Sequence, residues 1–222
     1  MKTAELTRED WLAQLEAGTC VTHFERRSLA PEVLEHILEA GCQTALPWNL
    51  QPWQFVLVTE AAAREKLLRH CVDPGPAATA PALVIALGDP GAWKQAPARL
   101  TEMVISSSLE PGSEARHLSR IRQQWGAGDT ARVFAIAQTH AALQQMRLVG
   151  LALGVSSCWI GEFDAAGIAG DFHIPASLLV VTVLGLGTCS GRAVLPRASL
   201  ARAVFAEAYG LPWRRPGDDK EN

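Results

Sequence analysis

Three apolar runs along the chain have the composition of buried β-strands. Residues 55–59 (Phe-Val-Leu-Val-Thr), 82–88 and 178–185 consist mostly of aromatic, β-branched and aliphatic side chains. A shorter strand and turn is predicted over residues 155–164, where Asp164 is placed to cap the helix that follows. These four segments predict the strands of the protein's core.

Helical patterns lie between and around these runs. Residues 7–18 predict a first helix, with polar capping residues before its apolar positions and Gly at its end. Residues 31–41 begin with Pro, carry an apolar stripe and end with Gly, which indicates a second helix. Residues 61–71 favour one exposed helix, and residues 199–209 predict another.

The longest predicted helix covers residues 132–153 and would be about 33 Å long at about 1.5 Å per residue. Ala, Leu, Val, Met and Ile occur on almost every face of it. A helix that is apolar all round is either buried at the centre of a protein or placed at an interface. We therefore expect His140, which lies on it, to be a core or interface histidine rather than a metal ligand.

Two segments have no strong pattern. In residues 89–131, Pro and Gly break short helical patches, which predicts a mobile insertion or lid of helix and loop. The C-terminal extension, residues 211–222, is largely polar and charged, so we expect its end to be frayed or wrapped onto a partner. A chain of 222 residues can bury roughly 70% of its unfolded surface around one core, so a single domain over residues 1–222 is expected.

Composition excludes several classes of function. The chain is 48% hydrophobic and 19% charged, as is typical of a globular protein. Its net charge of −3 gives no electrostatic reason to expect nucleic acid or an anionic membrane as a partner. The longest apolar run, residues 178–186, is far short of the roughly 20 residues that a membrane helix needs. Five scattered cysteines and a polar start predict a soluble cytoplasmic protein with reduced thiols.

Common catalytic and nucleotide-binding motifs do not fit. Residues 185–191 are rich in Gly, but the third Gly comes one residue late for a dinucleotide fingerprint, and the loop runs into Pro196 rather than a helix. The chain has no Gly-x-x-x-x-Gly-Lys, no Gly-x-Ser-x-Gly and no His-Glu-x-x-His. Its six histidines have no ligand spacing, so no metal site is expected.

One loop places polar and aromatic side chains directly ahead of a core strand. Residues 48–53 read Trp-Asn-Leu-Gln-Pro-Trp, and Pro52 is expected to push Gln51 into an extended conformation. The polar side chains of such a loop can bind the edge of a flat heteroaromatic ligand, and its aromatic side chains can pack on the ring face. The alternative is a turn whose tryptophans fill the core.

A second polar cluster precedes a predicted helix. Arg26, Arg27 and Ser28 come just before the helix that starts at Pro31. At such a position the helix dipole, backbone N–H groups and guanidinium groups can converge on a phosphate. The alternative is a solvated pair of arginines.

Together with two further stretches, these clusters resemble the nitroreductase family of FMN-dependent flavoenzymes. The further stretches are residues 154–163 (Gly-Val-Ser-Ser-Cys-Trp-Ile-Gly-Glu-Phe) and residues 195–197 (Leu-Pro-Arg). The Asn-x-Gln-Pro-Trp element at residues 49–53 is the most specific part. The resemblance covers residues 24–200 and is thin between 89 and 131.

This resemblance implies an α+β fold with three α-β-α layers and a mostly antiparallel central sheet, in an intertwined homodimer whose interface includes residues 132–153. The Arg-Arg-Ser cluster and the late arginines would hold the FMN phosphate and ribityl chain. The loop before the strand would touch the flavin ring, commonly from the opposite subunit, and a later turn would lie beside flavin N5. The implied FMN-binding residues are Arg26, Arg27, Ser28, Leu46, Pro47, Trp48, Asn49, Gln51, Ile160, Gly161, Glu162, Arg192 and Arg197.

Two features depart from the family's usual pattern. Ala30 stands where a further basic residue is common, and Ala45-Leu46-Pro47-Trp48 replaces a stretch of small residues. An indole beside the flavin would narrow the pocket above the ring. The alternative is that Trp48 packs at the subunit interface.

The activity implied by the resemblance is ping-pong transfer of hydride from NAD(P)H, through flavin N5, to a nitroaromatic, quinone or similar conjugated acceptor. No catalytic side chain is expected, because the cofactor carries the chemistry. Three alternatives remain open. They are a specialised relative that destroys flavin, removes halide or oxidises azolines, a flavin-binding protein with little turnover, and a structural protein without a ligand.

Overall fold

The structure is a computed structural model that describes residues 7, 9, 13, 15, 19–126 and 128–213. Contacts divide the chain into two compact units. The first comprises residues 1–5 and 21–192, and the second comprises residues 6–20 and 193–222. Of the first predicted helix, Glu9, Ala13 and Leu15 are described and are helical, and most of its other residues lie outside the described residues, as does the end of the C-terminal extension.

The first unit is built on a four-stranded antiparallel sheet with the strand order β2-β3-β5-β4. The four predicted core strands are confirmed. Trp53 pairs with Gly88 and Val58 with Leu83, so the loop before β2 and the loop before β3 lie at opposite ends of the sheet. The strands are β2 (Trp53–Val58), β3 (Ala82–Gly88), β4 (Ser156–Ile160) and β5 (Leu179–Gly187).

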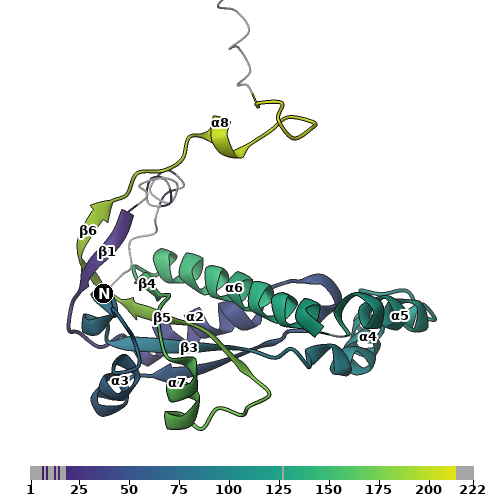
Figure 1. The fold of residues 1–222 in the computed structure, drawn as a ribbon, viewed down its shortest axis with the longest axis horizontal. Helices are drawn as coiled ribbons and strands as arrows, with labels where there is room; N and C mark the ends of the chain where they lie inside the picture. Colours follow the sequence, from purple (N-terminus) through teal and green to yellow (C-terminus); the bar gives the residue numbers. More distant parts are fainter. Residues whose placement is uncertain are drawn as a thin grey trace, which may run out of the picture. The chain divides into compact units, whose positions relative to one another are not determined.

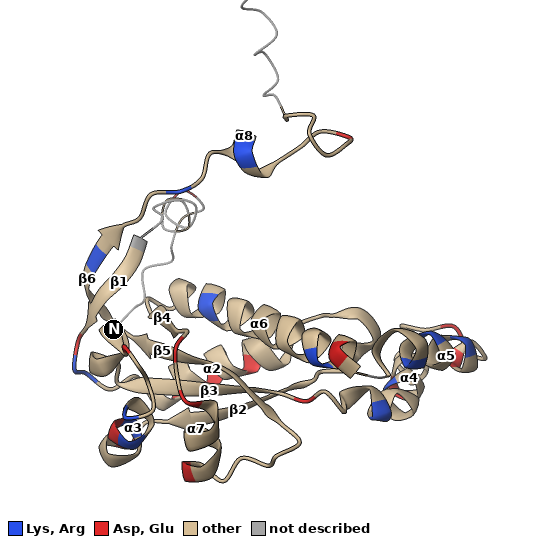
Figure 2. Cartoon of the chain, viewed as in Figure 1, with Lys and Arg blue, Asp and Glu red and all other residues tan. Residues whose placement is uncertain are grey.

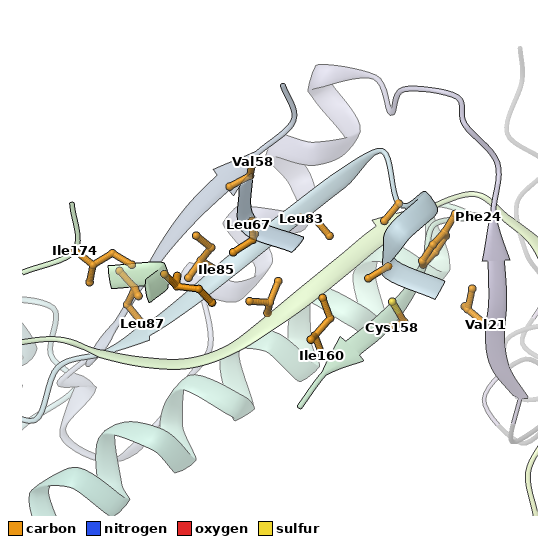
Figure 3. Close-up of a cluster of buried hydrophobic side chains, with 14 residues drawn as sticks. Val21, Phe24, Val58, Leu67, Leu83, Ile85, Leu87, Cys158, Ile160 and Ile174 are labelled. Atoms are coloured by element: carbon orange, nitrogen blue, oxygen red, sulfur yellow. The ribbon is translucent and has the colours of Figure 1, made fainter. Parts of the chain in front are cut away.

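Helices cover both faces of this sheet. On one face pack α3 (Ala61–Leu68) and α7 (Ala165–Asp171), and on the other α2 (Pro31–Cys42) and α6 (Gly128–Ala152) (Figure 1). Successive side chains of a strand point to opposite faces. Ile85 of β3 accordingly lies in the first core cluster (Figure 3), and its neighbours along the strand lie in the second. The fold is therefore the predicted α+β arrangement of three layers.

The long helix α6 is confirmed, and it has both a buried and an exposed side. Leu143 and Met146 are fully buried in the cluster shared with α2. Val133 is 63% exposed, and Leu148 is half-buried. Figure 2 shows that α6 carries few charged residues. Among the described helices, none combines the length and apolar character that a membrane-spanning segment requires.

The predicted insertion is a helical subdomain of the first unit. It contains a short 3₁₀ helix, η3 (Ala92–Gln95), followed by α4 (Ala96–Ile105) and α5 (Glu114–Trp125). These helices share a third apolar cluster with Leu50, from the loop before β2, and with Phe134 of α6. The insertion therefore has a core that it shares with the rest of the unit.

The sequence analysis did not predict two of the strands. β1 (Thr19–Phe24) and β6 (Cys189–Val194) form a second, two-stranded sheet. The sequence predicts a loop over residues 23–29, but the first two of these residues are still strand. Directly after β1, the amide of Glu25 donates to the carbonyl of Thr188 at 2.9 Å.

In the second unit, the helix predicted over residues 199–209 is much shorter. α8 spans only Leu200–Ala203. Glu207 has a φ of 60° and Gly210 a φ of 88°, and these left-handed positions cannot continue a right-handed helix. The prediction of a helix over residues 199–209 is therefore wrong beyond Ala203, because the chain turns back on itself and Phe205 pairs with Pro212.

Candidate functional site

A polar cavity of about 290 Å³ lies where β2 ends and β3 begins. Arg26 and Ser28 line it from the segment between β1 and α2. Thr79 holds this segment in place, because its Oγ1 accepts a hydrogen bond from the amide of Phe24 at 3.0 Å and donates to the carbonyl of Pro76 at 3.0 Å. The other lining residues are Thr59, Ala61, Arg64, Glu65, Leu68, Ala78, Thr79 and Pro81.

Arg27 and Arg192 lie at the same end of the sheet but do not line this cavity. Arg27 Nη2 donates to Thr188 Oγ1 at 3.4 Å, and its side chain is 70% exposed. Arg192 Nη2 donates to Ser156 Oγ at 3.0 Å. Arg197 belongs to the second unit, so its role at the phosphate stays a prediction.

The polar-aromatic loop lies at the other end of the sheet. It includes a short 3₁₀ helix, η1 (Pro47–Asn49), and leads directly into Trp53. β2 separates it from the cavity by about 17 Å, that is, five steps of about 3.4 Å. Within one chain, the loop and the Arg26 cavity are therefore separated by the length of a strand. The predicted ring contacts in this loop are Leu46, Pro47, Trp48, Asn49 and Gln51.

The backbone of this loop is left-handed at three positions that are not Gly. Trp48 has a φ of 64°, and Asn49 and Gln51 each have a φ of 47°. The expected extended conformation of Gln51 before Pro52 is therefore wrong. A hydrogen bond from Gln51 Nε2 to the carbonyl of Cys42, at 3.1 Å, holds the residue in its unusual conformation. Such strain persists only where surrounding contacts determine the conformation.

Those contacts come from the insertion. The Trp48 ring lies 4.9 Å from the ring of His117 on α5, and Leu50 is only 1% exposed. Leu50 packs with Leu100 of α4 and Ile121 of α5 in the third apolar cluster. The insertion of the same chain therefore determines how the loop presents its polar groups.

The predicted turn beside flavin N5 follows β4. Ile160 is buried, and its carbonyl accepts a hydrogen bond from Thr182 Oγ1 at 3.0 Å. Gly161 and Glu162 are exposed, and the Glu162 carbonyl accepts from the amide of Val72 at 3.0 Å. The turn is thus tied to the sheet and to the segment after α3, while Gly161 and Glu162 face solvent.

Two charged residues of the cavity were missed by the sequence analysis. Arg64 and Glu65 belong to α3, which the sequence indicates only as an exposed helix. Their place in the cavity depends on the turn before β3, which is distant in sequence. No pattern in the sequence around these two residues indicates that contact.

A His-Asp pair elsewhere in the unit has a structural role. His70 Nε2 lies 2.9 Å from Asp171 Oδ2, and Lys66 Nζ donates to the carbonyl of Asp171 at 2.7 Å. The hydrogen bond with His70 holds the pKa of the Asp171 carboxyl below its ordinary value. Desolvation opposes this effect, and the charges of Lys66 and His70 add to it. The pair joins α3 to the end of α7.

We expect Asp171→Asn to lower the thermal midpoint at pH 7, with a difference from wild type that shrinks toward pH 3. Folding lowers the pKa of Asp171, so the pair stabilises the fold above the unfolded carboxyl pKa of about 3.9. This contribution is lost as the pH falls through the folded-state pKa. Thermal unfolding at several pH values measures it, with the exposed Glu35→Gln as the control. A difference independent of pH would contradict the electrostatic explanation.

Comparisons with known proteins identify the family of the chain. Residues 19–188 match the model of the nitroreductase family. A Ralstonia nicotianae protein assigned as an NADH dehydrogenase/NAD(P)H nitroreductase is 32% identical over 72% of this chain and 74% of that protein. The NADH dehydrogenase of Thermus thermophilus is 26% identical over 73% of this chain and 78% of that protein.

Solved structures share the fold. A structure from Exiguobacterium sibiricum, assigned as a nitroreductase and solved in complex with FMN, superposes with a TM-score of 0.76 at 18% identity. The match covers 90% of this chain and 97% of that one. In the described part of our chain, no group of His, Cys, Asp and Glu residues could hold a metal ion. The protein therefore belongs to the nitroreductase family of oxidoreductases.

Proposed function

We propose that this protein is an FMN-dependent oxidoreductase that takes hydride from NAD(P)H and delivers it to a nitroaromatic, quinone or similar conjugated acceptor. The observation that carries the proposal is the cavity at the end of β2, where Arg26 and Ser28 meet two threonines. Guanidinium and hydroxyl groups are suited to a phosphate dianion and a ribityl chain. The donor set therefore fits the polar end of FMN.

The loop before β2 supplies groups suited to the other end of FMN. Asn49 and Gln51 can pair with the polar rim of an isoalloxazine, and the indole of Trp48 can border its face. When bound, FMN supplies the hydride chemistry, and the protein supplies binding and orientation.

The separation of the two ends supports a homodimer. A single FMN held by the cavity and by the loop needs the loop of a second copy, because β2 separates the two within one chain. A two-fold axis then generates two equivalent sites. Val133 on the exposed side of α6 and the half-exposed Trp159 of β4 are the apolar residues that we assign to this interface.

The decisive experiment is to identify a bound flavin and then measure turnover. Purified protein is expected to be yellow and to release FMN on denaturation. It should oxidise NADH or NADPH when a quinone or nitroaromatic is supplied. Colourless protein that cannot be reconstituted with FMN would reject the cofactor. Bound FMN without NAD(P)H oxidation would reject only the catalytic part, and would favour a flavin-binding protein with little turnover.

A further inference from the structure

Arg64 projects from the first turns of α3 into the cavity that Arg26 and Ser28 line. The same residue also borders a neighbouring, more apolar groove of about 850 Å³ along α2 and the edge of β2. Arg64 therefore stands between a small polar compartment and a larger, less polar one. Such a junction suits a ligand with a charged end and an apolar body.

Two hydrogen bonds brace the guanidinium of Arg64. Nε donates to the carbonyl of Thr59 at 3.1 Å, and Nη1 donates to the carbonyl of Ala80 at 2.8 Å. A guanidinium has five N–H donors in a fixed plane, so these two bonds leave others for a ligand. An arginine held in this way loses little further side-chain entropy when an anion binds. Lysine, a point charge on a flexible stem, cannot be braced in the same way.

The charges around the cavity favour a ligand anion. Arg26 and Arg64 contribute two positive charges, and Glu65 contributes one negative charge beside them. The hydroxyls of Thr59 and Thr79 add neutral polar groups. The arrangement attracts a phosphate dianion and offers an uncharged alcohol no comparable advantage.

We propose that Arg64 is a phosphate-binding residue of this site, and that it makes the protein select FMN over riboflavin. The proposal rests on the proposed FMN function. It adds the guanidinium of Arg64 to the phosphate site. Arg64 is held by hydrogen bonds to the cavity wall, and it belongs to α3 rather than to the segment that carries the Arg-Arg-Ser cluster.

The test is to titrate flavin-free protein with FMN and with riboflavin. Arg64→Ala is expected to weaken FMN binding by roughly ten- to a hundredfold, the range for losing a charge-assisted hydrogen bond. Riboflavin binding should change little. Arg69→Ala, at the exposed end of the same helix, is the matched control and should change neither affinity. Arg64→Lys should recover part of the FMN affinity.

Several outcomes would overturn the proposal. Equal losses for both flavins would make Arg64 a structural brace, and an unchanged FMN affinity would remove it from the site. Wild-type protein that binds neither flavin would instead reject the proposed function, which separates the two failures. Circular dichroism and thermal unfolding establish whether Arg64→Ala is folded.

Glu65→Gln is a second variant, and its expected effect on FMN affinity is opposite to that of Arg64→Ala. Its result does not depend on whether Arg64→Ala folds. Glu65 is exposed, so its replacement should leave the fold intact. Removing its negative charge is expected to tighten FMN binding severalfold and leave riboflavin binding unchanged. Unchanged FMN affinity in this variant would show that the phosphate does not bind next to α3, and would overturn the assignment of Arg64.

Discussion

FMN binding is expected to weaken by about a hundredfold or more when Arg26 and Arg197 are both replaced with Ala. Arg26 lines the cavity at the end of β2, and Arg197 is the predicted second phosphate contact from the C-terminal unit. Each charge-assisted hydrogen bond contributes about 1.5–3 kcal/mol, so two account for about 3–6 kcal/mol. At about 1.4 kcal/mol per tenfold change, the expected loss spans about 10² to 10⁴.

Fluorescence titration of flavin-free protein with FMN measures this loss of affinity. The two single variants show how much of the loss each arginine accounts for. Arg69→Ala combined with Arg120→Ala removes two exposed arginines, one at the C-terminal cap of α3 and one in α5, and serves as the matched double control. If the Arg26/Arg197 double variant bound FMN as tightly as wild type, the phosphate assignment would be wrong. If Arg26→Ala alone accounted for the whole effect, Arg197 would have to be removed from the site.

Val133→Glu is expected to convert a dimer into monomers and to abolish stable FMN binding. The Val133 side chain is 63% exposed in one chain, so a charge there costs the isolated fold little. At the proposed interface each copy would bury an unpaired carboxylate, which destabilises the dimer by roughly 2–6 kcal/mol for two copies. FMN would be lost with the dimer, because each site lacks the loop of the second copy.

Light scattering coupled to size-exclusion chromatography measures the mass, and the visible spectrum measures the bound flavin. Ile105→Glu is the matched control, since Ile105 is an apolar residue of α4 that is 78% exposed. The control should remain dimeric and yellow. A Val133→Glu variant with unchanged mass and flavin content would move the interface away from this part of α6. A monomer that still bound FMN tightly would contradict the shared site.

The core could be predicted because its determinants are local. Residues 55–59 and 82–88 are both dense in apolar side chains. β3 lies inside the sheet and all of its residues are buried, whereas β2 is an edge strand in which only Trp53 and Val58 are buried. Pro31 starts α2 as expected, and the side chain of Asp164 caps α7 by accepting from the amide of Ala166 at 3.0 Å. In each case the residue and the group that it satisfies are neighbours in sequence.

The features that could not be predicted depend on contacts between distant segments. β1 becomes a strand because β6 pairs with it more than 160 residues later, and its own residues are not strongly apolar. The left-handed φ of Gln51 opposes the usual preference before Pro, and a bond to Cys42 stabilises it. Arg64 enters the candidate site only because the turn before β3 folds against α3.

The contact between Trp48 and His117 bears on how members of this family can be recombined. Replacing residues 89–131 with the equivalent segment of a relative would take away the ring on which Trp48 rests and much of the cluster that buries Leu50. The loop would then relax from its left-handed backbone. A chimera that keeps its activity would have to inherit residues 46–51 from the same parent as the insertion, so the two segments are expected to be exchanged as one module.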